Sequence, residues 1–199
     1  MPAADGTMKR DVVGAEELRA RIIAHQRWLE DSITGRTSED ARQLSITDAV
    51  LSDIELSGEN LSDAQFVRCV FTRSSFDRCD FTGALFIDSK LPFVQFRQCT
   101  LRKADLTNAD LSDGNLSGSD LTRADLTRAL LSRATLSDSD LRGAWLIDTD
   151  LREADLSRVQ LQGARLLRTK LFRARGLAPG ALDDALVQDA ILGDDGKAD

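Results

Sequence analysis

The three cysteines are the side chains of this sequence that could take part in the most kinds of chemistry. Cys69, Cys79 and Cys99 could bind a metal ion or form a redox pair, because thiolates are both zinc ligands and nucleophiles. They form no CxxC motif, however, and a zinc site would lack a fourth ligand. An odd number of cysteines in a chain without an apolar signal segment favours reduced thiols and a cytoplasmic location. We therefore expect no metal and no cofactor, and cysteines that act as small hydrophobic residues.

His25 is the single histidine and the natural candidate for a general base. It lies in a predicted amphipathic helix over residues 14–33, on the apolar face formed by Leu18, Ile22, His25, Leu29 and Ile33. No Ser or Cys nucleophile accompanies it, and the chain has no glycine-rich phosphate loop. A packing role in a cap is the favoured interpretation, and we predict that the protein is not an enzyme.

Aspartate is abundant, which could indicate paired carboxylates or a calcium site. The aspartates are not clustered, however, because they recur directly before a leucine at Asp105, Asp110, Asp120, Asp125, Asp140, Asp150 and Asp155. This recurrence makes them part of a repeat, and the repeating units must position these polar residues.

Leu, Phe or Ile occupies every fifth position from Ile46 to Leu171, which makes 26 consecutive positions in one phase. The residue two positions earlier is nearly always small, and the three cysteines lie in this small register. A period of five fits neither a helix nor a strand, because on a helix the leucines would spread around the axis. We expect a solenoid in which each unit forms one side of a coil and points its large and small residues inward. Cys79 and Cys99, one coil apart, would lie within disulfide range, but parallel side chains and a reducing compartment argue against the bond.

The units 104–108 (ADLTN) and 124–128 (ADLTR) resemble the pentapeptide-repeat family. The resemblance implies an all-β solenoid, a right-handed quadrilateral parallel β-helix of about six and a half coils, over residues 44–175. In this family the aspartate before the leucine supports the turn through side-chain-to-backbone hydrogen bonds. The segment 25–29 (HQRWL) resembles a leader found before bacterial pentapeptide repeats, which suggests a bacterial protein.

Both ends of a solenoid need covers. We predict a disordered leader over residues 1–13, a capping helix and linker over 14–43, and a short C-terminal helix and tail over 176–199, with Pro179 at the start of that helix. In the gyrase-protecting branch of the family a C-terminal element makes a symmetric dimer. The sequence leaves open whether this chain forms such a homodimer.

Outward residues 20 positions apart should share a side of the rod, and most outward apolar residues gather on one side and its edge. The candidate protein-contact residues are Val67, Leu85, Ile87, Phe93, Leu130, Trp145, Ile147 and Leu167. Such a stripe has two interpretations. It is a contact surface for a partner, or it is covered by the N-terminal helix or the C-terminal tail of the chain itself. Pro92 cannot donate a ladder hydrogen bond, and the sequence leaves open whether the chain bulges at Pro92–Phe93.

The distribution of net charge along the chain helps to distinguish two hypotheses for the function. The chain carries a formal net charge of −7, and by count residues 44–173 hold only −2 of it while residues 174–199 hold −4. This distribution argues against direct nucleic-acid binding, which needs a basic surface, and no apolar run is long enough for a membrane span.

The first hypothesis is a non-catalytic scaffold that binds an unidentified protein through the apolar stripe. The alternative, implied by similarity to quinolone-resistance members, is a DNA mimic that binds the topoisomerase gyrase and gives drug resistance. A nearly neutral rod weakens that alternative, because mimicry of phosphates needs a dense negative field.

Overall fold

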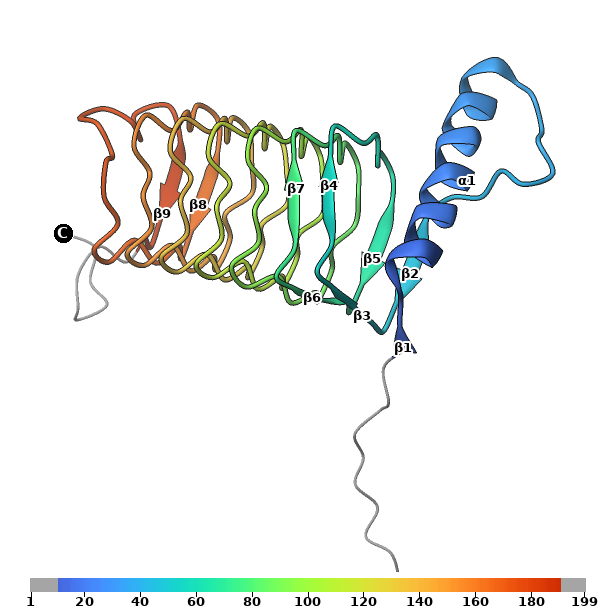
Figure 1. The fold of residues 1–199 in the computed structure, drawn as a ribbon. Coiled ribbons are helices and arrows are strands. Elements are labelled where there is room, and N and C mark those ends of the chain that lie inside the picture. Colours follow the sequence, from blue (N-terminus) through green and yellow to red (C-terminus); the bar gives the residue numbers. More distant parts are fainter. Residues whose placement is uncertain (1–10, 191–199) are drawn as a thin grey trace, which may run out of the picture.

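A parallel β-solenoid of about seven turns forms the body of the protein, with one helix across its N-terminal end (Figure 1). We describe residues 11–190 of this computed structural model. Its elements are β1 (Asp11–Val12), α1 (Ala15–Thr34), β2 (Ser45–Thr47), β3 (Ala49–Ser52), β4 (Glu55–Ser57), β5 (Gln65–Val67), β6 (Val70–Thr72), β7 (Ser75–Asp77), β8 (Arg165–Leu167) and β9 (Leu186–Gln188).

Parallel pairing with a register of 20 residues builds the coils. Ser45 pairs with Gln65 between β2 and β5, and single bridges continue the same offset in steps of five residues from Asn60–Asp80 to Asp155–Arg175. Each coil therefore has four five-residue sides, which we number from β2 (side 1), β3 (side 2), β4 (side 3) and the Asn60 bridge (side 4). The predicted solenoid and its phase are confirmed.

The interior consists of the large and small residues that the period places inward. Leucines such as Leu106 and Leu126 and alanines such as Ala104 and Ala124 are fully buried. The early coils are filled by phenylalanines, with Phe66 stacked on Phe86 and Phe76 on Phe96, each pair at 5.3 Å between ring centroids. Burial of one large side chain per unit supplies ~1.5–3 kcal/mol before entropy costs are counted, so this column is the main source of stability.

A tight turn ends each five-residue unit. In the unit that begins at Leu61, the Leu61 carbonyl accepts a hydrogen bond from the Ala64 amide at 3.1 Å, and Asp63 has a φ of 59°. Positive φ recurs at every fifth position from Asp48 to Arg173. A positive φ at the third residue defines a type II turn, which usually carries glycine there. Here aspartates and arginines occupy most of these positions.

The aspartates that precede the leucines hold these turns. Each of the seven accepts a hydrogen bond from the backbone amide two residues later, as Asp105 does from Thr107 at 2.9 Å. The turn-supporting role that the family resemblance implied is confirmed. The same geometry answers the open question at Pro92–Phe93, where the chain does not bulge. Pro92 lies at the second turn position, whose amide the coil-to-coil ladder does not use, while Leu91 and Phe93 donate normally to Asp110 and Ser112.

The N-terminal segment differs from the prediction at two points. Residues 11–13 were expected in a disordered leader, but β1 pairs with β3, and the Val13 amide donates to the Val50 carbonyl at 3.1 Å. This strand covers the open edge of side 2, and residues 1–10 lie outside the described part. Ile33 was expected on the packed face of the helix but is 85% exposed, because the last turns of α1 extend past the coil (Figure 1). The helix ends before Gly35, as predicted.

The predicted C-terminal helix is wrong as far as residue 190. Gly176 and Gly180 have φ near 80°, and successive turns over residues 178–185 lead into β9 instead. This strand adds a further side to the solenoid by pairing with β8, with Arg165 opposite Leu186. The offset is 21 rather than 20, so one extra residue has been accommodated in the last coil. In the described part of the chain, no helix is both long and apolar enough to cross a membrane.

Candidate functional site

Side 1 of the solenoid carries two apolar patches on its outer surface. The proximal patch consists of Val67, Leu85 and Ile87, all half-buried. The distal patch consists of Trp145, Ile147, Leu167 and Leu186, and Leu130 borders it at the corner with side 2. Within side 1, bridges from Gln65 to Leu85 and from Trp145 to Arg165 place Leu85 and Trp145 in one column.

The two patches are not one stripe. Between them lie two polar coils, which place Asp105 and Asp125 in the column of Leu85 and Trp145. Leu85 and Trp145 are three coils apart, and at ~4.8 Å per coil this places ~14 Å between them. Nor does α1 lie along side 1, since it crosses the first coil, with Leu18 and Ile22 buried against it. The helix is therefore ruled out as an internal cover for the apolar surface.

Trp145 is the centre of the distal patch. Its side chain is 45% exposed, and the Arg165 guanidinium carbon on the next coil lies 5.6 Å from its ring centroid. Leu186, 63% exposed, comes next in the same column through the Arg165–Leu186 pairing. A tryptophan that contacts a cation, with an exposed leucine two coils further along the same column, is a surface suited to burial by a partner.

Leu186 belongs to this patch only because of the extra residue in the last coil. In the regular phase, position 186 would be inward, 20 residues after the buried Leu166. The shifted register places Val187 in the inward column and turns Leu186 outward. Sequence reasoning missed this residue, because the five-residue repeat stops before the insertion and gives no register beyond it.

Two predicted contact residues lie off side 1. Phe93 is 66% exposed but lies in the column of Arg73 and Asp113, at the far corner of side 2. Leu130 begins side 2 and lies just around the corner from side 1, bridged to Asp110 and Asp150 in its own column. Leu130 can therefore border the distal patch, whereas Phe93 cannot share a contact surface with it.

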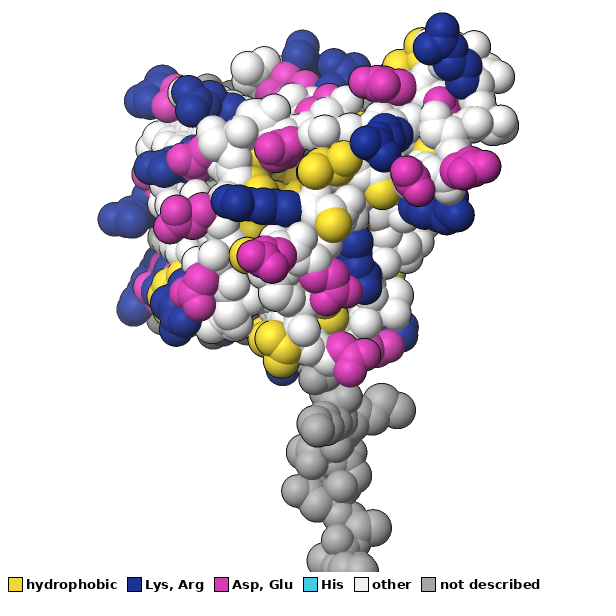
Figure 2. All heavy atoms as spheres, turned by 45° about the vertical axis from the view of Figure 1, so that its right-hand side comes forward, with side chains coloured by type: hydrophobic (Ala, Val, Ile, Leu, Met, Phe, Trp, Pro, Cys, Tyr) yellow, Lys and Arg dark blue, Asp and Glu magenta, His cyan; other side chains and the backbone are white. Residues whose placement is uncertain are grey.

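Ion pairs between successive coils neutralise much of the outer wall. In six pairs an arginine donates hydrogen bonds to an aspartate 20 residues earlier: Asp48–Arg68, Asp53–Arg73, Asp77–Arg97, Asp113–Arg133, Asp138–Arg158 and Asp148–Arg168. The bonding guanidinium lowers the pKa of Asp53, Asp113, Asp138 and Asp148 below its ordinary value. Acidic and basic side chains consequently lie next to one another on the visible face (Figure 2).

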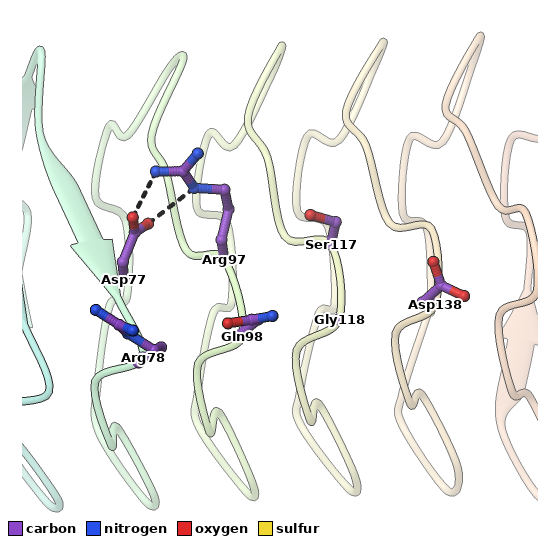
Figure 3. Close-up of a pocket in the computed structure, with 7 residues that line it drawn as sticks. All are labelled: Asp77, Arg78, Arg97, Gln98, Ser117, Gly118 and Asp138. Carbon is purple, nitrogen blue, oxygen red and sulfur yellow. Dashed lines mark hydrogen bonds and ion pairs between the residues drawn. The ribbon is translucent and has the colours of Figure 1, made fainter.

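A shallow hollow on side 3 brings several charged groups together. It encloses about 540 Å³ over the small residues Ser117 and Gly118, between Gln98 and Asp138 (Figure 3). Arg97 points toward Asp77 and is bonded to it, and Asp138 accepts hydrogen bonds from Arg158. Each charged pair is thus engaged within the wall, and the hollow offers no nucleophile with a base.

The cysteines lie where the repeat predicts, in the small inward column. All three are buried, and the Cys99 thiol donates to the Phe76 carbonyl one coil away. Burial raises the pKa of the Cys99 thiol to about 12, so the reactive thiolate is strongly disfavoured. Within residues 11–190 no three histidine, cysteine or carboxylate side chains gather where a metal ion could be held.

Comparison with known families agrees with this geometry. A model described as "Pentapeptide repeat region" matches residues 59–132, and one described as "Pentapeptide repeats (8 copies)" matches residues 134–175. Together they cover more than half of the 199 residues. The chain belongs to the pentapeptide-repeat family. A search of curated proteins gave no significant match.

Solved pentapeptide-repeat structures resemble the chain in fold. QnrB1, "a plasmid-mediated fluoroquinolone resistance protein", is 19% identical with a TM-score of 0.50, covering 73% of this chain and 87% of its own. HetL, "involved in heterocyst differentiation regulation" in the cyanobacterium Nostoc, is 21% identical with a TM-score of 0.31, covering 86% of this chain and 97% of its own. The right-handed β-helix represented by QnrB1 is the fold of this chain.

A pentapeptide-repeat solenoid offers its outer wall and its two ends as binding surfaces, because its interior is filled by side chains. The wall of this pentapeptide-repeat protein is distinguished by the distal patch on side 1. Its N-terminal end is closed by α1, and the last strand of the described part, β9, is exposed.

Proposed function

We propose that the protein is a non-catalytic scaffold that binds a protein partner through the distal patch. The observation that carries the proposal is Trp145, exposed at the centre of a rigid wall and held by Arg165. Aromatic residues that are fixed before binding lose little conformational entropy when a partner covers them, so they contribute strongly to affinity. Leu130 and Leu186 extend the apolar area around the indole ring.

Affinity purification with three forms of the chain tests this proposal. Wild-type protein, Trp145→Asp and Phe93→Asp are used as baits in the lysate of the source organism. Phe93 is a matched control, because it is an exposed aromatic residue on another side of the rod. We expect a partner that is retained by the Phe93 variant and lost by the Trp145 variant. If every protein recovered binds both variants equally, the distal patch is not the contact surface.

The alternative function is DNA mimicry toward gyrase, with resistance to gyrase-directed drugs. The fold shared with QnrB1, a fluoroquinolone resistance protein, is compatible with this alternative. The six aspartate–arginine pairs weigh against it, because they replace a line of negative charge by alternating charge. Supercoiling and drug-induced cleavage by gyrase, measured with excess purified protein, provide the test. Unchanged supercoiling and cleavage would reject this alternative.

A second copy of the chain is a further candidate partner, through the C-terminal segment. All three residues of β9 are exposed, and Val187 is 40% exposed although it occupies the inward column. Exposed strand residues at the last described coil are of the kind that can pair with another chain. Light scattering coupled to size exclusion should show a dimer that Val187→Asp converts to a monomer. If the wild-type protein stays a monomer over a 100-fold range of protein concentration, homodimerisation is contradicted.

A further inference from the structure

His25 occupies an unusual position between the cap and the first coil. Its side chain is fully buried, and its Nδ1 accepts a hydrogen bond from the Leu44 amide at 3.1 Å. Leu44 lies 20 residues before Ala64, whose amide donates to the carbonyl of its own turn, that of Leu61. No repeat unit precedes Leu44, so no turn carbonyl is present to accept a hydrogen bond from its amide. The imidazole ring of His25 accepts this hydrogen bond instead. The single histidine thus joins α1 to the first residue of the solenoid ladder, since the Leu44 carbonyl accepts from Gln65.

This hydrogen bond fixes the protonation state of the ring. An imidazole nitrogen that accepts a hydrogen bond carries no proton, so the ring is neutral with its hydrogen on Nε2. Nε2 is itself buried and has no hydrogen-bond partner among residues 11–190. Trp28, one turn along α1, stacks on the ring with 5.5 Å between centroids and 14° between planes.

The charged groups around His25 do not hold it protonated. Burial lowers the pKa of His25 below its ordinary value, against the opposing effects of the Ser62 backbone and the Asp63 carboxylate in the first coil. Glu59, also in the first coil, accepts a hydrogen bond from Gln26 at 2.7 Å.

Three cationic groups of the cap have partners of their own. Arg21 on α1 pairs with Glu17, and Arg27 pairs with Asp40. In the linker, the Arg42 guanidinium donates to the carbonyl oxygens of the linker itself. The protonated ring of His25 would therefore meet the Ser62 backbone and the Asp63 carboxylate on one side, and otherwise the apolar contact between α1 and the coil.

We propose that His25 is an acid-sensitive latch that holds α1 on the first coil and releases it when protonated. A proton on Nδ1 would point at the Leu44 amide, so two donors would face each other and a cation would be buried. The released helix would expose His25 to water, where it protonates near its ordinary pKa of about 6.5. Because the docked state has the lower pKa, the latch is fully effective above that pH and weakens as the pH falls below it. Release would uncover Leu44 and the open edges of β2 and β4.

Trp28 provides a direct probe, because the chain has only one other tryptophan, Trp145. In a Trp145→Phe background, Trp28 fluorescence is titrated from pH 7.5 to 4.5, and hydrogen exchange over residues 15–34 is compared at pH 7.5 and 5.0 after correction for intrinsic rates. We expect a fluorescence transition with a midpoint below pH 6.5. Exchange in α1 should be at least ~10-fold faster at the lower pH, while exchange in coils 100–160 stays unchanged.

Two variants separate the latch from a carboxylate effect. His25→Asn keeps an acceptor for the Leu44 amide but does not titrate, so the pH dependence of α1 exchange should disappear. Asp63→Asn removes the carboxylate that favours the protonated ring, so the transition should remain and move to lower pH. The proposal is overturned if α1 exchange in the wild-type cap is the same at both pH values, if His25→Asn keeps the transition, or if Asp63→Asn abolishes it.

Discussion

Trp145 and Arg165 lie in the same outward column of successive coils, with the guanidinium carbon 5.6 Å from the indole centroid. The arginine thus restrains the largest side chain of the distal patch. We predict that Arg165→Ala increases the internal motion of the Trp145 indole and lowers the free energy of unfolding by about 0.5–1 kcal/mol. Relaxation of the ¹⁵N-labelled indole measures the motion, and the Trp28 indole is an internal reference. Equal order parameters in both proteins would show that Arg165 does not restrain the ring.

The pair Asp113–Arg133 should show how much one inter-coil ion pair contributes. Both guanidinium contacts are 2.7 Å, and the arginine side chain is half-exposed, so a double-mutant cycle with Asp113→Asn and Arg133→Gln should give a coupling of about 0.2–1 kcal/mol. The pKa of Asp113 is lowered from 3.8 by the arginine. The coupling should therefore be complete above pH 4 and disappear as the pH falls below the lowered pKa. A coupling that persists at pH 2 would contradict this account.

Lys103 tests the cost of positive φ at the turns. Its φ is 56°, a conformation that costs a non-glycine residue about 1–2 kcal/mol, while glycine adopts it freely. We expect Lys103→Gly to raise the free energy of unfolding by about 0.5–1 kcal/mol in urea denaturation. Lys90, in an extended bridge position, is the matched control, and Lys90→Gly should destabilise the protein by about 1 kcal/mol. The same sign for both variants would refute a role for backbone conformation.

Val94 and Gly114 form a complementary pair in the small inward column. They lie one coil apart, and a Cβ added to Gly114 would come within 3.3 Å of the Val94 side chain and 2.8 Å of the Leu111 carbonyl oxygen. We predict that Gly114→Ala destabilises the solenoid by about 1–3 kcal/mol through overpacking. Adding Val94→Ala should recover part of this loss, because alanine above alanine is the ordinary arrangement elsewhere. Strict additivity of the two changes in thermal unfolding would argue against contact between them.

Cys99 should be unreactive in the folded protein. Its thiol is buried, and desolvation raises its pKa to about 12, so almost no thiolate exists at pH 8. A disulfide reagent such as DTNB should therefore label Cys99 in a Cys69→Ala, Cys79→Ala background only after unfolding. A reaction of folded protein within seconds at pH 8, at the rate of a free peptide thiol, would show that the coil opens around this position.

The sequence alone was sufficient for the repeated body of the molecule. An unbroken five-residue phase fixes which residue of each unit is inward, because one slip would expose a whole column of leucines to water. It also fixes which residues share a column. The pairing of Asp113 with Arg133 and the turn contact of Asp105 are therefore implicit in spacings of 20 and of two residues.

The ends were decided by tertiary structure, because there the phase no longer constrains the chain. One extra residue in the last coil turned Leu186 outward and placed Val187 inward, which no pattern before Gly176 could specify. At the other end, the length of α1 relative to the coil left Ile33 in solvent. His25 acquired its role in the same way. Its position on an apolar face predicted burial, but only the docking of α1 against Leu44 gave its ring the hydrogen bond that a missing turn would have made.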